Sequence, residues 1–231
     1  MSRNGKSVSF SGGYEVSATD PKLVDGKYLV SWERKFSAGG KASGKKVGVS
    51  GSHEDSEFGS KTFKTEAEAK AFKENAASQL PSRAHDPTTV EGAMYLDVGE
   101  MRGSGDKTSG GISANASFSG GGGIGGGVEK STQSGTEVRR VSPTVFELTK
   151  MAGDRTGGSF NMKNVAIGMT AHGASDEVTQ TTVSVDISTP EGKLAFDTFM
   201  KTGMPTVGAK LVSTSRVSGS GLRCGTRQLM R

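Results

Sequence analysis

The feature that most restricts the fold of this chain is a run without charged residues from Ser109 to Val128. In its first half, apolar residues alternate with small polar ones, and glycines at 120–123 separate it from a second apolar run. Period-two alternation is typical of a β-strand with one apolar face, and a glycine turn between two such runs favours a β-hairpin. The apolar positions of this hairpin are Ile112, Ala114, Ala116, Phe118, Ile124 and Val128.

A second charge-free run with the same alternation lies between Asn164 and Ser175. Its apolar positions are Val165, Ile167, Met169 and Ala171. Strands that cross a bilayer are about 9–11 residues long and alternate between a lipid face and a wet face. A half-buried antiparallel strand of a soluble sheet shows the same alternation. The pattern therefore predicts either two membrane hairpins, Ser109–Thr132 and Ser159–Val185, or two hairpins that cover a protein core.

The composition indicates a thin hydrophobic core. Hydrophobic residues make up 32% of the 231 positions and aromatic residues 6%, whereas glycine occurs 35 times. Glycine adds almost nothing to burial and costs backbone entropy when it is ordered. Such a chain gains more than most from ladder hydrogen bonds, from a partner subunit or from a membrane.

Turn and cap signals predict a mainly β (α+β) fold of antiparallel hairpins or a meander, with two short helices packed on the sheet. Asp25-Gly26 between apolar flanks favours a type I′ turn. Thr65 and Glu68 have capping-box spacing, and Pro81 ends the helix that they begin. A second helix is expected from Pro190 to Thr202, with Thr189 as its cap and Gly203 as its stop.

Between these helices the glycine and proline breaks divide the chain into short strands. Breaks are expected at Gly103–Gly105, Ser134-Gly135 and Gly153-Asp154, among others. The expected strands are 93–101, 111–119, 124–132, 136–142, 144–151, 159–171 and 178–187. The whole chain is then divided into a flexible N-terminal arm (1–13), a hairpin and helix region (14–89), a meander and helix region (90–205) and a basic, disordered tail (206–231).

The net charge of +5 belongs to the end of the chain, because no acidic residue follows Asp197. A confined excess of charge argues against a broad nucleic-acid surface. The tail favours three roles: a solvated disordered end, an anchor for anionic lipid, or a peptide that contacts an acidic partner. The candidate contact residues of the tail are Arg216, Arg223, Arg227 and Arg231.

The sequence contains no pattern that predicts catalysis, a metal or a cofactor. Residues 39–46 approach a phosphate-binding loop, but they end in Lys46 where a serine or threonine would ligate magnesium. His53, His85 and His172 have no second ligand at metal spacing. Cys224 has no histidine near it in the sequence, and its role stays open. We therefore expect no enzyme activity, no cofactor and no small-molecule substrate.

These observations predict a protein that acts through shape, assembly or membrane contact. Residues 1–10 lack the apolar core of a signal peptide, so we expect synthesis in the cytoplasm, then membrane insertion or export by a dedicated system. The leading hypothesis is a toxin-like, pore-forming effector that inserts into a lipid membrane as a homo-oligomer. The alternative is a structural, self-assembling β protein of a particle, fibre or sheath, without membrane activity.

Overall fold

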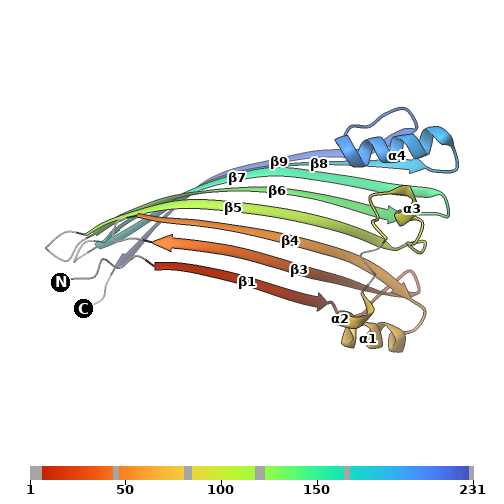
Figure 1. The fold of residues 1–231 in the computed structure, drawn as a ribbon, viewed down its shortest axis with the longest axis horizontal. Coiled ribbons are helices and arrows are strands. Elements are labelled where there is room, and N and C mark those ends of the chain that lie inside the picture. The colour runs from red at the N-terminus through yellow and green to blue at the C-terminus, as the bar shows by residue number, and fades with distance from the viewer. Residues whose placement is uncertain (1–6, 44–46, 81–84, 118–122, 164–166, 229–231) are drawn as a thin grey trace.

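The structure is a computed structural model that describes residues 7–43, 47–80, 85–117, 123–163 and 167–228. These residues form one antiparallel sheet of nine strands, in the order β1-β3-β4-β5-β6-β7-β8-β9, with β2 paired to β3 (Figure 1). The strands are β1 Ser7–Ala18, β2 Lys22–Val24, β3 Lys27–Ser43, β4 Val47–Phe63, β5 Met101–Ser117, β6 Gly123–Arg140, β7 Val145–Lys163, β8 Ile167–Asp186 and β9 Ala209–Gln228.

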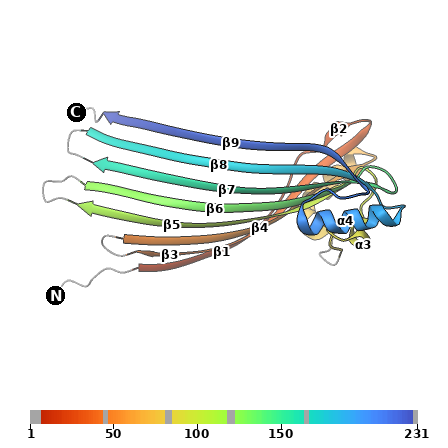
Figure 2. The same cartoon turned by 90° about the horizontal axis from the view of Figure 1, so that it is seen from above.

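Helices accompany the sheet at one of its ends (Figures 1 and 2). They are α1 Glu66–Glu74, α2 Ala76–Gln79, α3 Val90–Ala93 and α4 Pro190–Thr202. The mainly β fold with short helices on the sheet is therefore confirmed, with four helices in the described residues where two were expected. No helix in this described part is long and apolar enough to cross a membrane.

The hydrophobic core lies where these helices pack on the sheet. Phe196 and Phe199 of α4 are fully buried together with Phe146 and Leu148 of β7. A smaller cluster joins Phe72 of α1 to Val30 and Trp32 of β3. A row of paired residues, Trp32–Gly59–Arg102–Val138–Leu148, connects the two clusters across the sheet. Both clusters therefore lie on one face, which we call the helix face.

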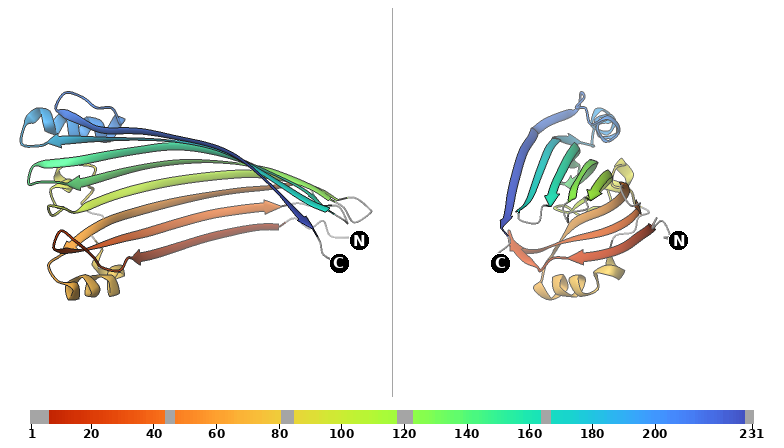
Figure 3. Two further views of the ribbon diagram at one scale, coloured as in Figure 1. Left: turned by 180° about the vertical axis from the view of Figure 1, so that it is seen from behind. Right: turned by 90° about the vertical axis from the view of Figure 1, so that its left-hand side faces the viewer.

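The sheet extends far beyond this core as long hairpins. Figure 3 shows the twisted sheet from behind, with the helices confined to one end. We call the other end the free end: β1 begins there at Ser7, β5 ends there at Ser117, and β9 ends there at Gln228. The core thus anchors one end of each hairpin and leaves the other end without a second layer.

The predicted turn and helix caps are confirmed. Asp25 and Gly26 have φ values of 48° and 75°, as a type I′ turn requires. The capping box of Thr65 and Glu68 is present at α1. Thr189 caps α4 and Gly203 ends it with a φ of 74°.

Several predicted strand breaks are wrong, because their glycines lie inside strands. Gly103 belongs to β5, Gly135 to β6 and Gly153 to β7. A Cβ on Gly103 would lie 2.6 Å from the ring of Phe58 and 2.5 Å from the carbonyl oxygen of Thr136. These glycines make room for neighbouring side chains, so the short expected strands merge into strands of 17–20 residues.

The predicted strand 93–101 is also wrong. Residues 90–93 form α3, turns follow, and β5 begins only at Met101. Thr89 caps α3 by accepting a hydrogen bond from the amide of Gly92 at 3.1 Å. This local cap outweighs the period-two alternation of Met94, Leu96 and Val98, which by itself favours a strand.

The ends of the chain differ from the expected arm and tail. From Ser7 onward the N-terminal segment is an edge strand paired with β3, and from Ala209 onward the C-terminal segment is β9, paired with β8. Composition predicts disorder because these segments bury little apolar area. Ladder hydrogen bonds satisfy their backbone without such burial.

Candidate functional site

The free end carries large apolar side chains that are exposed on the helix face. A second row of paired residues, Val8–Ala42–Val49–Ile112–Val128, crosses the sheet here. Each member lies ten residues from its counterpart in the row Ala18–Trp32–Gly59–Arg102–Val138, and an even spacing keeps a strand residue on the same face. Exposed fractions are 65% for Val8, 53% for Val49, 62% for Ile112 and 60% for Val128.

Two further side chains extend this surface. Phe10 is 85% exposed and Val47 is 53% exposed. Phe10 stands over Gly40, where an added Cβ would lie 3.3 Å from its ring. We call Val8, Phe10, Val47, Val49, Ile112 and Val128 the apolar patch. Exposed apolar area of this kind marks a protein or membrane contact in soluble proteins.

The opposite face of the free end is lined mainly with serine and glycine, together with Lys41 of β3 and Glu129 of β6. The hydroxyls of Ser7 and Ser43 are hydrogen-bonded at 2.7 Å, and those of Ser52 and Ser109 at 2.6 Å. Gly48 lies so close to Ser113 that an added Cβ would be 2.8 Å from its hydroxyl. This face is therefore small and polar, so the free end is amphipathic across its thickness.

Three strands of the free end lack formal charge over several residues, whereas the neighbouring strands carry Lys41 on β3 and Glu129 and Lys130 on β6 at the same level. No acidic or basic residue occurs in 7–14 of β1, 47–52 of β4 or 108–117 of β5. The β5 segment is ten residues long, which matches the 9–11 residues that a tilted strand needs to cross a bilayer.

The structure brings the predicted hairpin positions together at the free end. Ile112 and Val128 are paired on adjacent strands and belong to the apolar patch, and Ala114 pairs with Val47. The backbone pairs Ala116 with Ile124, Met169 with Met162, Ala171 with Phe160, and Ile167 with Gln228. Phe118 and Val165 lie outside the described residues.

Sequence reasoning missed that β1 and β4 contribute to the same surface. The signal was present in the alternation of Val8 with Phe10 and of Val47 with Val49. These runs are short and each follows a lysine, so the pattern alone does not separate them from ordinary hairpins. Only the register shows that Val8 and Val49 lie in the row of Ile112 and Val128, with Phe10 and Val47 two residues away along their strands.

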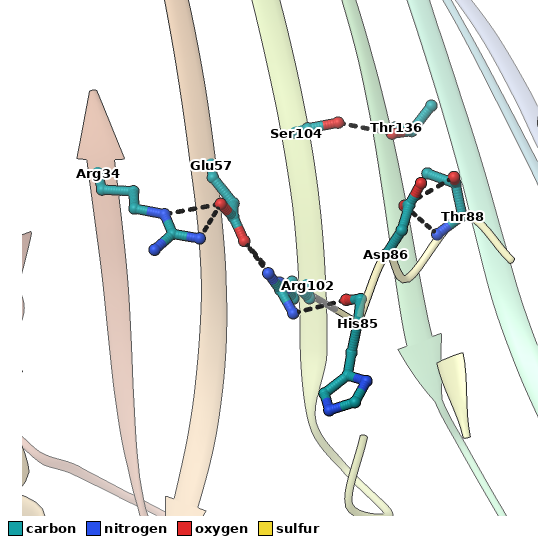
Figure 4. Close-up of polar contacts among 8 residues, drawn as sticks. All are labelled: Arg34, Glu57, His85, Asp86, Thr88, Arg102, Ser104 and Thr136. Carbon is teal, nitrogen blue, oxygen red and sulfur yellow. Dashed lines mark hydrogen bonds and ion pairs between the residues drawn. The ribbon is translucent and has the colours of Figure 1, made fainter. Parts of the chain in front are cut away.

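A group of linked ion pairs lies on the helix face between the core and the free end (Figure 4). The Nε of Arg34 on β3 donates to Glu57 on β4 at 2.7 Å, and the Nε of Arg102 on β5 donates to the other carboxylate oxygen at 2.6 Å. Arg102 also donates to the carbonyl oxygen of His85 at 2.9 Å. All three charged side chains are largely buried. One carboxylate thus ties three neighbouring strands together.

A cleft of about 720 Å³ opens beside this group. Several of its polar groups are bonded to one another: Ser104 to Thr136 at 3.0 Å, and the Thr88 hydroxyl to Asp86 at 2.8 Å (Figure 4). Lys150 lines the same cleft, and its ammonium group donates to the Lys201 carbonyl oxygen at 3.3 Å. This pairing fits a role in joining the helices to the sheet. The expected lack of enzyme activity stays a prediction.

The register also assembles a cluster that the sequence did not predict. Asp55 and Asp106 face each other across β4 and β5, and the Nε2 of His53 lies 3.7 Å and 3.5 Å from their carboxylates. These residue types can bind a metal. The Nδ1 of His53 shares a hydrogen bond with Thr108 at 3.2 Å, and the three side chains are exposed or only half-buried. We describe the cluster as a surface ion-pair group.

The basic residues of the expected tail belong to β9. The guanidinium of Arg216 donates to Glu177 of β8 at 2.7 Å, so this residue is engaged within the sheet. Arg223 and Arg227 pair through their backbones with His172 and Gly168. Arg231 lies outside the described residues. The expected contacts of these basic residues with a lipid or an acidic partner stay a prediction.

No family model, curated protein sequence or solved structure matches this chain. The functional hypothesis therefore depends on the geometry of the free end.

Proposed function

We propose that this protein is a pore-forming effector that perforates a lipid membrane as an oligomer, with the free end of its sheet inserted in the bilayer. One observation carries the proposal: among the side chains that the structure describes at the free end of β1, β4, β5 and β6, the large exposed apolar ones lie on the helix face, and mainly serine and glycine lie on the opposite face. A strand in a membrane pore needs this division, because one face contacts lipid and the other contacts water.

The energetics of the apolar patch favour transfer out of water. Burial of apolar surface contributes about 25 cal/mol per Å². Phe10, Val8 and Ile112 are each more than half exposed, so most of their surface remains available for burial. Lipid supplies this burial without a second protein layer.

The charged groups between the core and the free end limit the depth to which the sheet can enter the bilayer. Arg34, Glu57, Asp55 and Asp106 lie on the helix face between the apolar patch and the helices. Charged side chains are costly in the bilayer centre, so we expect this level to remain at the membrane surface. The helices then stay outside the membrane as a rim.

The test is release of a dye from liposomes by two variants that place the same charge on opposite faces of β5. Ile112→Asp puts a carboxylate on the lipid face and should abolish leakage, because a charge there is costly in hydrocarbon. Ser113→Asp puts it on the small polar face and should retain leakage. Equal leakage from the two variants, or no leakage from the unaltered protein with neutral and anionic lipids, would count against the proposal.

A structural, self-assembling role is the second candidate, and the open edges of the sheet favour it. β1 and β9 are the outermost strands of the described sheet, and each lacks a partner strand on its outer side. Electron microscopy in buffer without lipid separates the two functions. Extended tubes or sheets combined with the absence of dye release would support assembly alone.

A further inference from the structure

The two open edges of the sheet fit each other. β1 runs from the free end toward the helices, and β9 runs in the opposite direction (Figure 1). This follows from the sheet order, because eight strands alternate in direction along the path from β1 to β9. A second copy in the same orientation, placed beside the first, therefore presents β1 antiparallel to β9.

We propose that copies of this chain associate edge to edge, with β9 of one copy paired to β1 of the next and all helices at the same rim. The proposed pore needs an oligomer with a closed sheet, so this pairing rests in part on that function. The pairing itself uses the backbone groups at the outer edges of β1 and β9, whereas the apolar patch consists of side chains, of which Val8 and Phe10 stand on β1. Such a heterologous contact makes a ring when its rotation closes and a filament when it does not.

Charge favours this contact over pairing of identical edges. β9 contains Lys210, Arg216, Arg223 and Arg227 and no acidic residue, whereas the only charged residue of β1 is Glu15. If the β9 strands of two copies were paired, the four positive charges of one strand would lie beside the four of the other and repel them. Pairing β9 with β1 removes this repulsion and sets opposite signs against each other.

The layers of the sheet also continue from one copy to the next. The apolar row that begins at Val8 ends at Leu222 of β9, and the row that begins at Ala18 in the core ends at Leu211. Both edge strands therefore reach the same levels of the sheet. Neighbouring copies paired in this register would have their apolar patches at the same height along the strands, and likewise their cores.

The outer edge of β1 has hydrogen-bonding groups ready for a partner. The amide of Thr19 donates to the carbonyl oxygen of Ser31 at 2.8 Å, which sets the phase of the β1–β3 ladder. Odd-numbered residues of β1 then bond to β3, and even-numbered residues direct their N–H and C=O groups outward. Neither β1 nor β9 contains proline, one of the devices that natural sheets use to block an edge.

Mixed disulfide cross-linking tests the pairing directly. In a Cys224→Ser background, one protein carries a single cysteine in β1, at Val8, Phe10 or Gly12, and a second carries one in β9, at Ser218, Ser220 or Leu222. Each protein is oxidised alone and after mixing, in buffer and with liposomes. We expect cross-linked dimers after the two proteins are mixed, and no dimers when either protein is oxidised alone. Dimers of a single protein, or none in any β1–β9 combination, would overturn the proposal.

Gly12→Pro gives an independent readout that leaves the β1–β3 ladder intact. Gly12 is even-numbered and has no positive φ, so proline removes only an outward N–H. We expect loss of oligomers in sedimentation while the circular dichroism spectrum stays unchanged. Oligomers equal to those of the unaltered protein would contradict edge pairing. Leakage is measured with the unaltered protein, because Val8 and Phe10 belong to the apolar patch. Leakage together with no β1–β9 cross-links would contradict the pairing but not the pore, whereas cross-links without leakage would contradict the pore but not the pairing.

Discussion

Single glycines decide where these long strands can pack closely. Gly103 sits between the ring of Phe58 and the carbonyl oxygen of Thr136, and Gly135 lies beside the end of Met151. Both glycines precede or follow polar residues in the sequence, as turn glycines do. Glycine permits a turn and it permits a close approach, and residue type alone does not distinguish the two. The sequence therefore predicts shorter strands than the structure contains.

Gly103→Ala should destabilise the protein by about 1–3 kcal/mol, as overpacking of a filled site does. The added Cβ would meet backbone at 2.5 Å, so a side-chain rotation cannot relieve the clash. Gly110→Ala in the same strand is the matched control, because its nearest neighbour would be 3.8 Å away. Urea unfolding should show loss of stability for the first variant only. Similar midpoints for both would refute close packing at Gly103.

At the scale of elements, one helix cap occurs twice. Asp86 accepts a hydrogen bond from the Thr88 amide at 2.9 Å, and Asp186 accepts one from the Ser188 amide at 3.0 Å. In each case the next residue is a threonine, and its hydroxyl oxygen accepts a hydrogen bond from the amide of the glycine three residues further on. The α4 copy was predictable because Pro190 and an apolar face follow it. The α3 copy was not, since only four helical residues follow Thr89.

The second cap also depends on ionisation. The backbone hydrogen bond from Ser188 lowers the pKa of Asp186 below its usual value, with help from the hydroxyls of Ser188 and Thr144. A lowered pKa in the folded state means that this contribution to stability is present above the unfolded pKa. It is lost as the pH falls through the folded pKa.

Gly192→Ala should unfold the start of α4. A Cβ there would lie 1.8 Å from the carbonyl oxygen of Asp186, which is backbone and is itself part of the cap. We expect a loss of at least about 2 kcal/mol, in the range of changes that break a cap and force backbone movement. Lys193→Ala, one residue along on the exposed side, should change stability little. Thermal unfolding followed by circular dichroism compares them, and equal melting temperatures would contradict the cap geometry.

At the scale of the whole molecule, three zones of different chemistry follow one another along the length of the strands. A helix-covered core, a level of ion pairs and an apolar end follow one another on the same face. Alternation and charge-free length predicted the apolar hairpin at Ser109–Val128 from sequence. The level of ion pairs was not predictable, because Arg34, Glu57 and Arg102 are far apart in the chain and meet only through strand register.

The most direct test of the account follows lipid contact along β5, one residue at a time. Single cysteines at Gly111, Ile112, Ser113 and Ala114, in a Cys224→Ser background, carry an environment-sensitive fluorophore, and emission is recorded before and after addition of liposomes. We expect blue-shifted, brighter emission at residues 112 and 114 and water-like emission at 111 and 113, because alternate residues face lipid and water. Emission that does not alternate, or that liposomes leave unchanged at all four positions, would contradict insertion of the free end into a membrane.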